Sequence, residues 1–518
     1  MKQKWIKKLI RQRFAAILIL VFQVAFFFWF VISGTRYFPY LAVVLFGLSF
    51  LVLLHIASSR IKGAFKLAWT YLICVVPLFG GIVYLIATFQ SPVRRFRKTS
   101  IRITDAARTL YMLHGSSRAQ AAKDYPHRET QMRYMEQRLG FPVYTDTEAE
   151  YYPWGMPFFK ALLAELETAE KYIFLEFFIV QEGVMWNSIL DILTKKAAQG
   201  VEVRVMYDDI GCFMLLPSDY CAELARRGIQ AQLFNPLKTA VAVNLNNRDH
   251  RKIVSIDGRT AFTGGINLAD EYINLIEKHG VWKDAGVKLT GSAAWSLTLL
   301  FLEMWELGKS MAAKTPAAVS REQFLPFFPQ QAQGKSKSGY AIPYGDSPMD
   351  DENTGEHVYM QLITVAKNYI YITTPYLILD DSVISALILA AKSGVDVRII
   401  TPHIADKWFV HVTTRSFYRE LIAGGIKIYE FTDGFIHAKT LVSDDDAAVV
   451  GTTNFDFRSL YLHFECGVIL YGTPAAAAVK KDFLDTVPQC IQITEQACRG
   501  NVFIRTLQSV LRLFAPLM

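Results

Sequence analysis

The part of the chain after residue 98 contains the same order of segments twice, and this duplication most constrains the fold. KYIFLEFFIV, from Lys171, and KNYIYITTPYLI, from Lys367, are each followed by a helical stretch, a glycine and a second apolar run. The glycines, Gly200 and Gly394, lie in the matching sequences AAQGVEVR and AKSGVDVR, which favour duplication over two unrelated α/β domains. Strand, helix, glycine and strand form the unit of a parallel sheet covered by helices. We therefore predict two duplicated α/β/α domains.

A histidine motif, HxKx4D, occurs once in each copy. Its six defining residues are His250, Lys252, Asp257, His437, Lys439 and Asp444. Each motif has an asparagine seventeen residues after its histidine, Asn267 or Asn454, and none of the other eight histidines has this spacing. A chance match at one histidine has a probability on the order of one in several hundred at average residue usage. We therefore predict that the two copies form one shared site across a pseudo-twofold interface.

Paired imidazoles and ammonium groups suit the chemistry of a phosphodiester. One neutral histidine can attack phosphorus while the other, protonated, donates its proton to the leaving alkoxide. We expect Lys252, Lys439, Asn267 and Asn454 to bind the non-bridging oxygens, whose charge grows in the transition state. Glycines beside the motifs would allow backbone and phosphate to approach closely. No metal or other cofactor is expected, because two lysines replace the divalent cation and no carboxylate cluster with metal spacing accompanies them.

Carboxylates in and near the motifs are expected to play two different roles. Each imidazole needs an acceptor that fixes its tautomer and orientation, and the candidates are Asp284 and Glu465. Asp257 and Asp444 complete the motifs as candidate catalytic residues, and turn formation is the alternative role for them.

The first 98 residues are typical of a membrane region. Three apolar segments, Ala15 to Ser33, Phe38 to Ala57 and Ala68 to Phe89, are 19, 20 and 22 residues long, and about 20 residues cross a hydrocarbon core. The third contains Pro77 and Gly80, so a re-entrant segment is the alternative to a third span. The basic residues near these segments favour opposite orientations of the large domain, and a re-entrant third segment would keep that domain in the cytoplasm.

Charge distribution argues against a nucleic-acid partner. Residues 1–98 contain 14 basic and no acidic residues, whereas the rest contains 41 basic and 47 acidic residues. The net basicity therefore belongs to the membrane region, and the remainder lacks the positive surface of a nuclease.

Composition and motifs divide the chain into six parts. They are a transmembrane region (1–98), a connecting segment (99–155), a first domain with its motif at 250–267 (156–329), a linker (330–339), a second domain with its motif at 437–454 (340–476) and a C-terminal helical segment (477–518). The last segment, from Val502, is expected to lie on the membrane surface or to dock on the second domain.

The paired motifs resemble those of the phospholipase D superfamily, and the chain from about residue 66 resembles its bacterial cardiolipin synthases. The residues that carry this resemblance are LAWTYLICVVPLFGGIVYLI, NRDHRKIVSIDGRTAFTGGINLADEY, YITTPYLI and IHAKTLVSDDDAAVVGTTNFDFRSL. The chain departs from the family pattern in WKDAG, where Ala285 and Gly286 replace a threonine and a histidine, and at His463, which replaces an asparagine.

The resemblance implies a multi-pass enzyme of the bacterial plasma membrane that transfers a phosphatidyl group between two phosphatidylglycerol molecules and releases glycerol. It implies that His250 becomes the phosphohistidine and that His437 is the acid and base. A phospholipase D-type hydrolase and a transferase with another acceptor alcohol remain the alternatives, because the same residues serve all three reactions. A membrane scaffold without activity is disfavoured because both motifs are intact.

Overall fold

The computed structural model describes residues 38–76, 80–88, 91–236, 246–313, 318–329, 338–498 and 501–517. Contacts divide the chain into an N-terminal unit, Met1–Val93 with Leu237–Val243, and a large unit, Arg94–Pro236 with Asn244–Met518. The first predicted membrane segment and most of the predicted linker lie outside the described residues.

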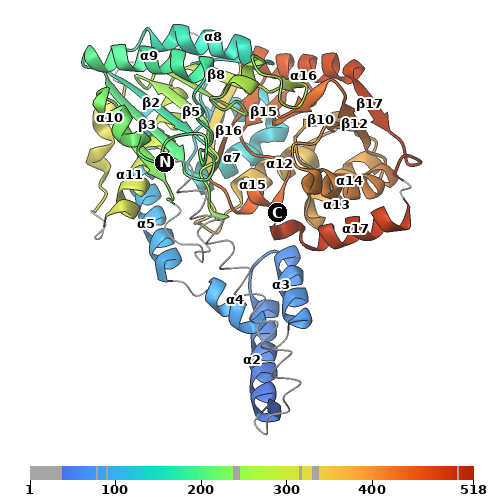
Figure 1. Cartoon of the computed structure of the whole chain (residues 1–518). Helices are drawn as coiled ribbons and strands as arrows, with labels where there is room; N and C mark the ends of the chain where they lie inside the picture. Colours follow the sequence, from blue (N-terminus) through green and yellow to red (C-terminus); the bar gives the residue numbers. More distant parts are fainter. Residues whose placement is uncertain are drawn as a thin grey trace. The chain divides into compact units, whose positions relative to one another are not determined.

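The N-terminal unit contains the helices α2 (Phe38–Ser58), α3 (Gly63–Val75) and α4 (Gly80–Thr88) (Figure 1). Pro39–Ser58 is, within the described residues, the one helix long and apolar enough to span a membrane. The third predicted segment is not one continuous helix, because α3 ends before Pro77 and α4 begins at Gly80. A plain third span is therefore not observed, whereas the broken form agrees with the re-entrant alternative.

Small residues allow the helices of this unit to pack closely. The side chains of Val52, Ile56, Ile73 and Tyr84 form its buried core. A Cβ atom placed on Gly80 would lie 2.6 Å from the Cα of Ile73, so the start of α4 requires glycine at this contact.

The large unit contains two sheets that share one strand order, with β17 added at the edge of the second, which confirms the predicted α/β fold class and the duplication (Figure 1). In spatial order the first sheet is β1 (Thr147–Tyr152), β8 (Gly286–Gly291), β6 (Thr260–Gly264), β5 (Ile253–Ile256), β2 (Tyr172–Phe177), β3 (Glu202–Asp208) and β4 (Gln230–Phe234). The second is β9 (Tyr340–Asp346), β16 (Glu465–Tyr471), β15 (Ala447–Gly451), β14 (Thr440–Ser443), β10 (Tyr369–Thr373), β11 (Asp396–Pro402), β12 (Lys427–Phe431) and β17 (Cys490–Ile493).

Each sheet is mixed rather than wholly parallel. The predicted strand–helix–strand units give the parallel strands β2, β3 and β4 and their counterparts β10, β11 and β12. The histidine motifs instead lead into antiparallel hairpins, β5–β6 and β14–β15, because connections of three residues, 257–259 and 444–446, join these strands.

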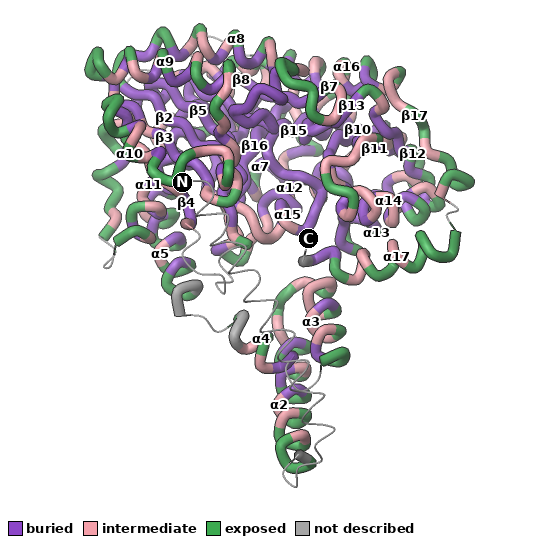
Figure 2. Tube along the Cα trace, in the orientation of Figure 1, coloured by how far each residue is buried: buried purple, intermediate pink, exposed green. Residues whose placement is uncertain are grey.

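Helices cover both sheets. In chain order they are α8 (Gly155–Leu166), α9 (Val184–Ala198), α10 (Tyr220–Arg226), α11 (Ala294–Ala312), α12 (Thr354–Val365), α13 (Asp381–Lys392), α14 (Trp408–Ala423), α15 (Phe457–Tyr461) and α16 (Pro474–Thr486). The helices outside this set are α5 (Ser91–Ala107), α6 (Arg118–Asp124), α7 (Glu129–Arg133) and α17 (Val502–Leu513). Helix α11 is buried on nearly every side because it contacts the first sheet and also β9 of the second (Figure 2).

Each sheet takes an edge strand from a segment outside the predicted domains. Strand β1 lies in the predicted connecting segment and pairs along its whole length with β8. Strand β17 lies in the predicted C-terminal helical segment and pairs with β12.

Candidate active site

Each motif histidine is held by the backbone of the other repeat. His437 follows β13 (Gly434–Ile436), which pairs in parallel with β7 (Val281–Lys283) of the first repeat. The His437 backbone N–H donates to the Lys283 carbonyl at 2.7 Å, and the His250 N–H donates to the Phe464 carbonyl at 2.9 Å. The repeats thus exchange equivalent hydrogen bonds across the pseudo-twofold axis, which brings both motifs to one interface.

The two predicted orienting carboxylates also come from the opposite repeat. The His250 Nδ1 lies 2.9 and 3.0 Å from the two carboxylate oxygens of Glu465. The His437 Nδ1 lies 2.6 Å from Oδ2 of Asp284. When Nδ1–H donates to a carboxylate, the neutral ring keeps its lone pair on Nε2, where it can act as nucleophile or base.

Glycine beside the first motif makes room for a carboxylate rather than for phosphate. A Cβ on Gly265 would lie 2.1 Å from Oδ1 of Asp284, and a Cβ on Gly451 would lie 2.7 Å from the Cys466 carbonyl. The expectation that such glycines admit phosphate is therefore not what the structure shows, because protein atoms already occupy these approaches.

The motif lysines are fully buried beside their histidines. Nζ of Lys252 donates to the His250 carbonyl at 2.6 Å, and Nζ of Lys439 donates to the His437 carbonyl and lies 2.8 Å from its Nδ1. Burial lowers the pKa of Lys252 to about 8 and that of Lys439 to about 7, although the nearby carboxylates oppose the shift. A phosphate bound here would favour the charged form of both lysines.

Burial also sets the protonation of the histidine–carboxylate pairs. Burial lowers the pKa of His250 and of His437 well below the usual value, and the positive charges of the motif lysines lower it further. Burial raises the pKa of Asp284 and of Glu465 to about 7. Each pair therefore gains or loses one shared proton near neutral pH.

We expect kcat/KM for the phosphodiester chemistry predicted at this site to be highest near pH 7. With His250 as the expected nucleophile and His437 as the expected acid, a proton on the His250–Glu465 pair would block attack below this range, and the His437–Asp284 pair would lose the proton for the leaving group above it. The lysines also lose charge as the pH rises through their pKa values of about 7 and about 8. A pH–rate profile with saturating and subsaturating lipid checks this, and a rate that still rises at pH 9 would contradict it.

The two asparagines differ in their hydrogen-bond partners. Oδ1 of Asn267 accepts from the Ile179 N–H at 3.1 Å, and its Nδ2 donates to the Tyr272 hydroxyl at 2.7 Å. Oδ1 of Asn454 is buried and has no hydrogen-bond partner among the described residues. Asn267 therefore holds the loop after β2 in place, whereas the Oδ1 acceptor of Asn454 has no hydrogen-bond partner among the described residues.

Asp257 and Asp444 lie at the far ends of β5 and β14 from the histidines, in the hairpin turns. Asp257 accepts from the backbone N–H groups of residues 170–172 at 2.8 to 2.9 Å. Asp444 accepts from those of residues 367–369 at 2.7 to 3.1 Å. Both have left-handed backbones, with φ of 53° and 54°. The structure does not bring these motif residues to the histidines, and their geometry agrees with the turn-forming alternative.

We expect Asp257→Ala to lower the free energy of unfolding by about 3 kcal/mol, because three amides lose their acceptor at about 1 kcal/mol each. The rate per folded molecule should change little. Thermal unfolding in detergent and the rate of the folded fraction check this. A rate loss of about 100-fold at an unchanged melting temperature would instead support a catalytic role.

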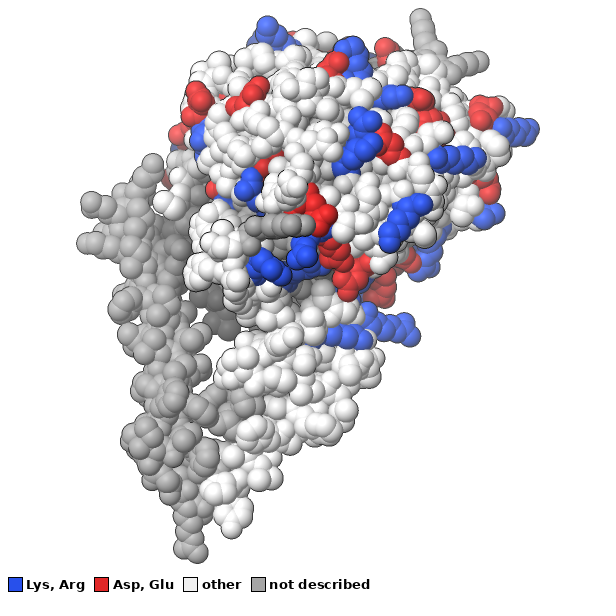
Figure 3. Space-filling view, turned by 90° about the vertical axis from the view of Figure 1, so that its right-hand side faces the viewer, with Lys and Arg blue, Asp and Glu red and all other residues white. Residues whose placement is uncertain are grey.

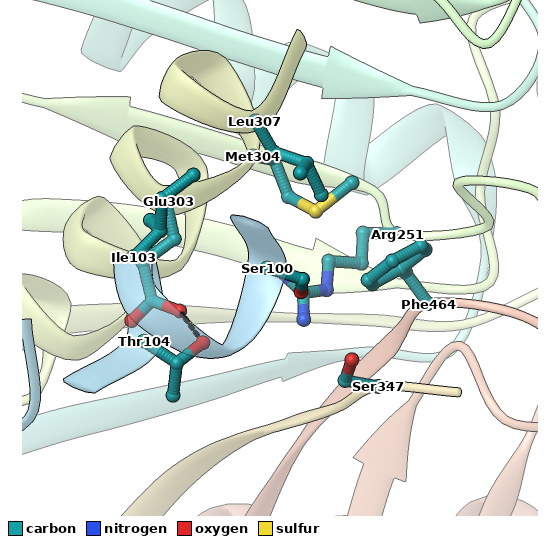
Figure 4. A pocket seen from close by; sticks show the side chains of 9 residues that line it. All are labelled: Ser100, Ile103, Thr104, Arg251, Glu303, Met304, Leu307, Ser347 and Phe464. Atoms are coloured by element: carbon teal, nitrogen blue, oxygen red, sulfur yellow. Dashed lines mark hydrogen bonds between the residues drawn. The ribbon is translucent and has the colours of Figure 1, made fainter. Parts of the chain in front are cut away.

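Arg251, between the two key residues of the first motif, is a supporting residue that the sequence reasoning did not single out. Its guanidinium donates to the carbonyl groups of Glu465, Leu300 and Asp346 at 3.1 to 3.3 Å. Figure 4 shows it at the edge of a small pocket with Phe464 and Glu303. Arg251 thus links β16 and β9 of the second repeat to α11 of the first through hydrogen bonds, one of them to the backbone of Glu465.

Aromatic rings and a loop lysine complete the surroundings of the histidines. The ring of Phe178 lies 5.1 Å from that of His250, and the rings of Trp282 and Tyr272 lie 5.5 and 5.6 Å from that of His437. The charge of Lys407 acts on both histidines. Sequence spacing gave no signal for these residues, since they come from separate segments of the chain.

One cluster among the described residues has a geometry that could hold a metal ion. One ligand atom from each of His250, His463 and Glu465 lies within 4.8 Å of the others. The ring of His463 lies 5.5 Å from that of His250.

Comparison with known proteins agrees with this architecture. The family model "Cardiolipin synthase, PLD-like domain" matches residues 162–286 and 359–486. The chain is 32% identical over 454 residues to cardiolipin synthase 2 of Bacillus anthracis, covering 87% of this chain and 86% of that protein. It is 40% identical over 468 residues to an uncharacterized protein of Streptococcus mutans serotype c, covering 90% and 99%. The structure of phosphatidylserine synthase from Haemophilus influenzae aligns with a TM-score of 0.56 at 16% identity, covering 75% of this chain and 97% of that one, which supports the fold.

Duplicated domains that share two HxKx4D motifs define the phospholipase D superfamily. Within it, the chain belongs to the bacterial cardiolipin synthases and is an enzyme of the phosphatidyltransferase class. The resemblance read from the sequence is thereby confirmed.

Proposed function

We propose that this enzyme makes cardiolipin and glycerol from two molecules of phosphatidylglycerol through a phosphohistidine on His250. The observation that carries the proposal is the crossed arrangement in which each repeat supplies the carboxylate for the other repeat's histidine. This arrangement provides two imidazoles with different tasks at one interface, as a double displacement requires.

In the first half-reaction, Nε2 of His250 attacks the phosphorus of phosphatidylglycerol and forms a P–N bond. The bond from phosphorus to the glycerol oxygen breaks, and His437 donates its proton to that oxygen, so glycerol leaves. Lys252 and Lys439 bind the non-bridging oxygens as their charge increases.

In the second half-reaction, neutral His437 removes the proton from the terminal hydroxyl of a second phosphatidylglycerol. That oxygen attacks the phosphohistidine, the P–N bond breaks, and cardiolipin forms while His250 returns to its neutral state. The phosphate charge is the same before and after, and His437 regains the proton that it donated.

The choice of His250 as nucleophile rests on the family resemblance, and the site geometry is compatible with it. Both carboxylate oxygens of Glu465 lie near the His250 Nδ1, whereas the His437 Nδ1 is shared between Asp284 and the ammonium of Lys439. The His437 ring also lies against aromatic rings, and such apolar surroundings help to keep water from competing with the acceptor lipid.

We propose a location in the bacterial plasma membrane with more than one membrane segment. Helix α2 supports the membrane location, and so does α17, which docks on α14 through Arg512, 2.6 Å from the Glu420 carboxylate. The outward side of α17 leaves Val502 and Phe503 each 78% exposed, as expected of a helix that touches a lipid surface. On the face shown in Figure 3, basic and acidic side chains of the large unit are interspersed, which does not favour a nucleic-acid ligand.

Exchange of labelled glycerol tests the covalent intermediate. The enzyme in mixed micelles with phosphatidylglycerol and radioactive glycerol should incorporate label into phosphatidylglycerol, because glycerol can attack the phosphohistidine. Cardiolipin formation without any exchange would support direct attack of one lipid on the other and contradict the proposal.

A further inference from the structure

His463 is a buried imidazole beside the proposed nucleophile without a role in the reaction scheme. Its side chain is 10% exposed, and neither ring nitrogen has a hydrogen-bond partner among the described residues. Burial, and next the charge of His250, hold the pKa of His463 well below its usual value. A neutral imidazole with both nitrogens uncommitted in a buried site is costly to leave unbound, which indicates a missing ligand.

We propose that His250, His463 and Glu465 form an inhibitory site for a divalent transition metal of the zinc type. Two imidazole nitrogens and a carboxylate oxygen are a donor set that Zn²⁺ uses, with an open fourth position for water. This inference rests on the proposed function only for the inhibition, because the donor set itself is independent of the reaction.

The distances need small adjustments to receive an ion. Nδ1 of His250 lies 2.9 Å from Oε1 of Glu465, and Nδ1 of His463 lies 3.8 Å from the same oxygen. Ligands at about 2.0 to 2.2 Å from a tetrahedral ion lie about 3.4 Å from one another. The first distance must therefore lengthen and the second shorten, each by about 0.5 Å.

Metal binding at this position would inactivate His250 through its tautomer. In the reactive form Nδ1–H donates to Glu465 and Nε2 carries the lone pair. An ion can bind Nδ1 only through a lone pair on that nitrogen. The ring proton therefore moves from Nδ1 to Nε2, and no lone pair on Nε2 is left to attack phosphorus. The Nδ1–H bond breaks and an Nε2–H bond forms, so the neutral ring keeps its single proton.

The test combines zinc binding with transfer rates in full-length protein. Wild type, His463→Asn and His403→Asn are each titrated with zinc chloride at pH 7.5. Calorimetry measures zinc binding, and the phosphatidylglycerol assay, with zinc buffered by a chelator, measures the transfer rate. His403 is a matched control because its Nδ1 also lies 2.8 Å from a buried carboxylate, that of Glu430, yet it belongs to no three-ligand cluster among the described residues. Each rate is compared with the metal-free rate of the same variant.

Wild type and His403→Asn should bind one zinc ion and lose activity reversibly, and His463→Asn should need at least about tenfold more zinc for both effects. Equal zinc sensitivity of His463→Asn and wild type would overturn the inference, as would zinc binding that leaves the rate unchanged. A protein that binds zinc in a His463-dependent way but makes no cardiolipin would support the metal site and refute the proposed function instead.

Discussion

Replacing His250 with glutamine is expected to lower kcat for cardiolipin formation by about 10⁴-fold or more, because the P–N intermediate has no other nucleophile. Glutamine fills similar space and retains an N–H group, so the interface with Glu465 should persist. His437→Gln should lower kcat by about 10² to 10⁴-fold, since it removes proton transfer while leaving the nucleophile.

A substrate with a good leaving group separates the two roles. Phosphatidyl p-nitrophenol needs no general acid, so His437→Gln should release a burst of nitrophenol equal to the enzyme concentration and accumulate a phosphatidyl group on His250, detectable by peptide mass spectrometry. His250→Gln should release no burst, and His403→Gln should behave like wild type. A burst from His250→Gln and none from His437→Gln would reverse the assignment, and full activity of either variant in cardiolipin synthesis would refute the two-histidine mechanism.

The second large effect is expected for Glu465→Gln and Asp284→Asn, each of which should lower kcat by about 10² to 10⁴-fold. An amide can present its N–H group to Nδ1, which places the ring proton on Nε2 and gives the wrong tautomer. The crossed contacts predict which half-reaction each change affects. Glu465→Gln should impair the burst with phosphatidyl p-nitrophenol, whereas Asp284→Asn should retain it.

Glu303→Gln is the matched control for these changes. Glu303 is likewise fully buried and hydrogen-bonded, to the hydroxyls of Tyr111 and Thr104, but it does not contact either histidine. It should retain a rate within about tenfold of wild type per folded molecule. If His437→Gln keeps its burst, normal burst kinetics in Glu465→Gln with a lost burst in Asp284→Asn would contradict the crossed pairing, and melting temperatures identify any variant that fails to fold.

The duplication was predictable because it is encoded locally, in the spacing of apolar runs, glycines and the two motifs. The same local patterns predicted the parallel strands but not the antiparallel hairpins or the edge strand β1, whose pairing with β8 joins residues far apart in the chain. The break in the third apolar segment was predictable from Pro77 and Gly80, because both residues disfavour a continuous helix.

The candidate site was predictable in its residue types and not in its contacts. Asp284 and Glu465 were candidates from the sequence, but their crossed pairing joins residues that are 153 and 215 positions apart from their partners. Asp257 shows the opposite case, since its position, repeated in both motifs, reflects a turn in which its carboxylate accepts from three backbone N–H groups. The spacing within a motif shows which residues recur in both repeats. It does not show whether a recurring residue takes part in catalysis or stabilises a turn.

The most direct test of the central claim uses purified enzyme and phosphatidylglycerol as the sole lipid, without nucleotide and with a chelator present. Lipid mass spectrometry and a glycerol assay then identify the products. The proposed mechanism predicts cardiolipin and glycerol in equal amounts. Phosphatidic acid with glycerol and no cardiolipin would show that water accepts the phosphatidyl group, and would contradict the assignment of this site to transfer between two lipids.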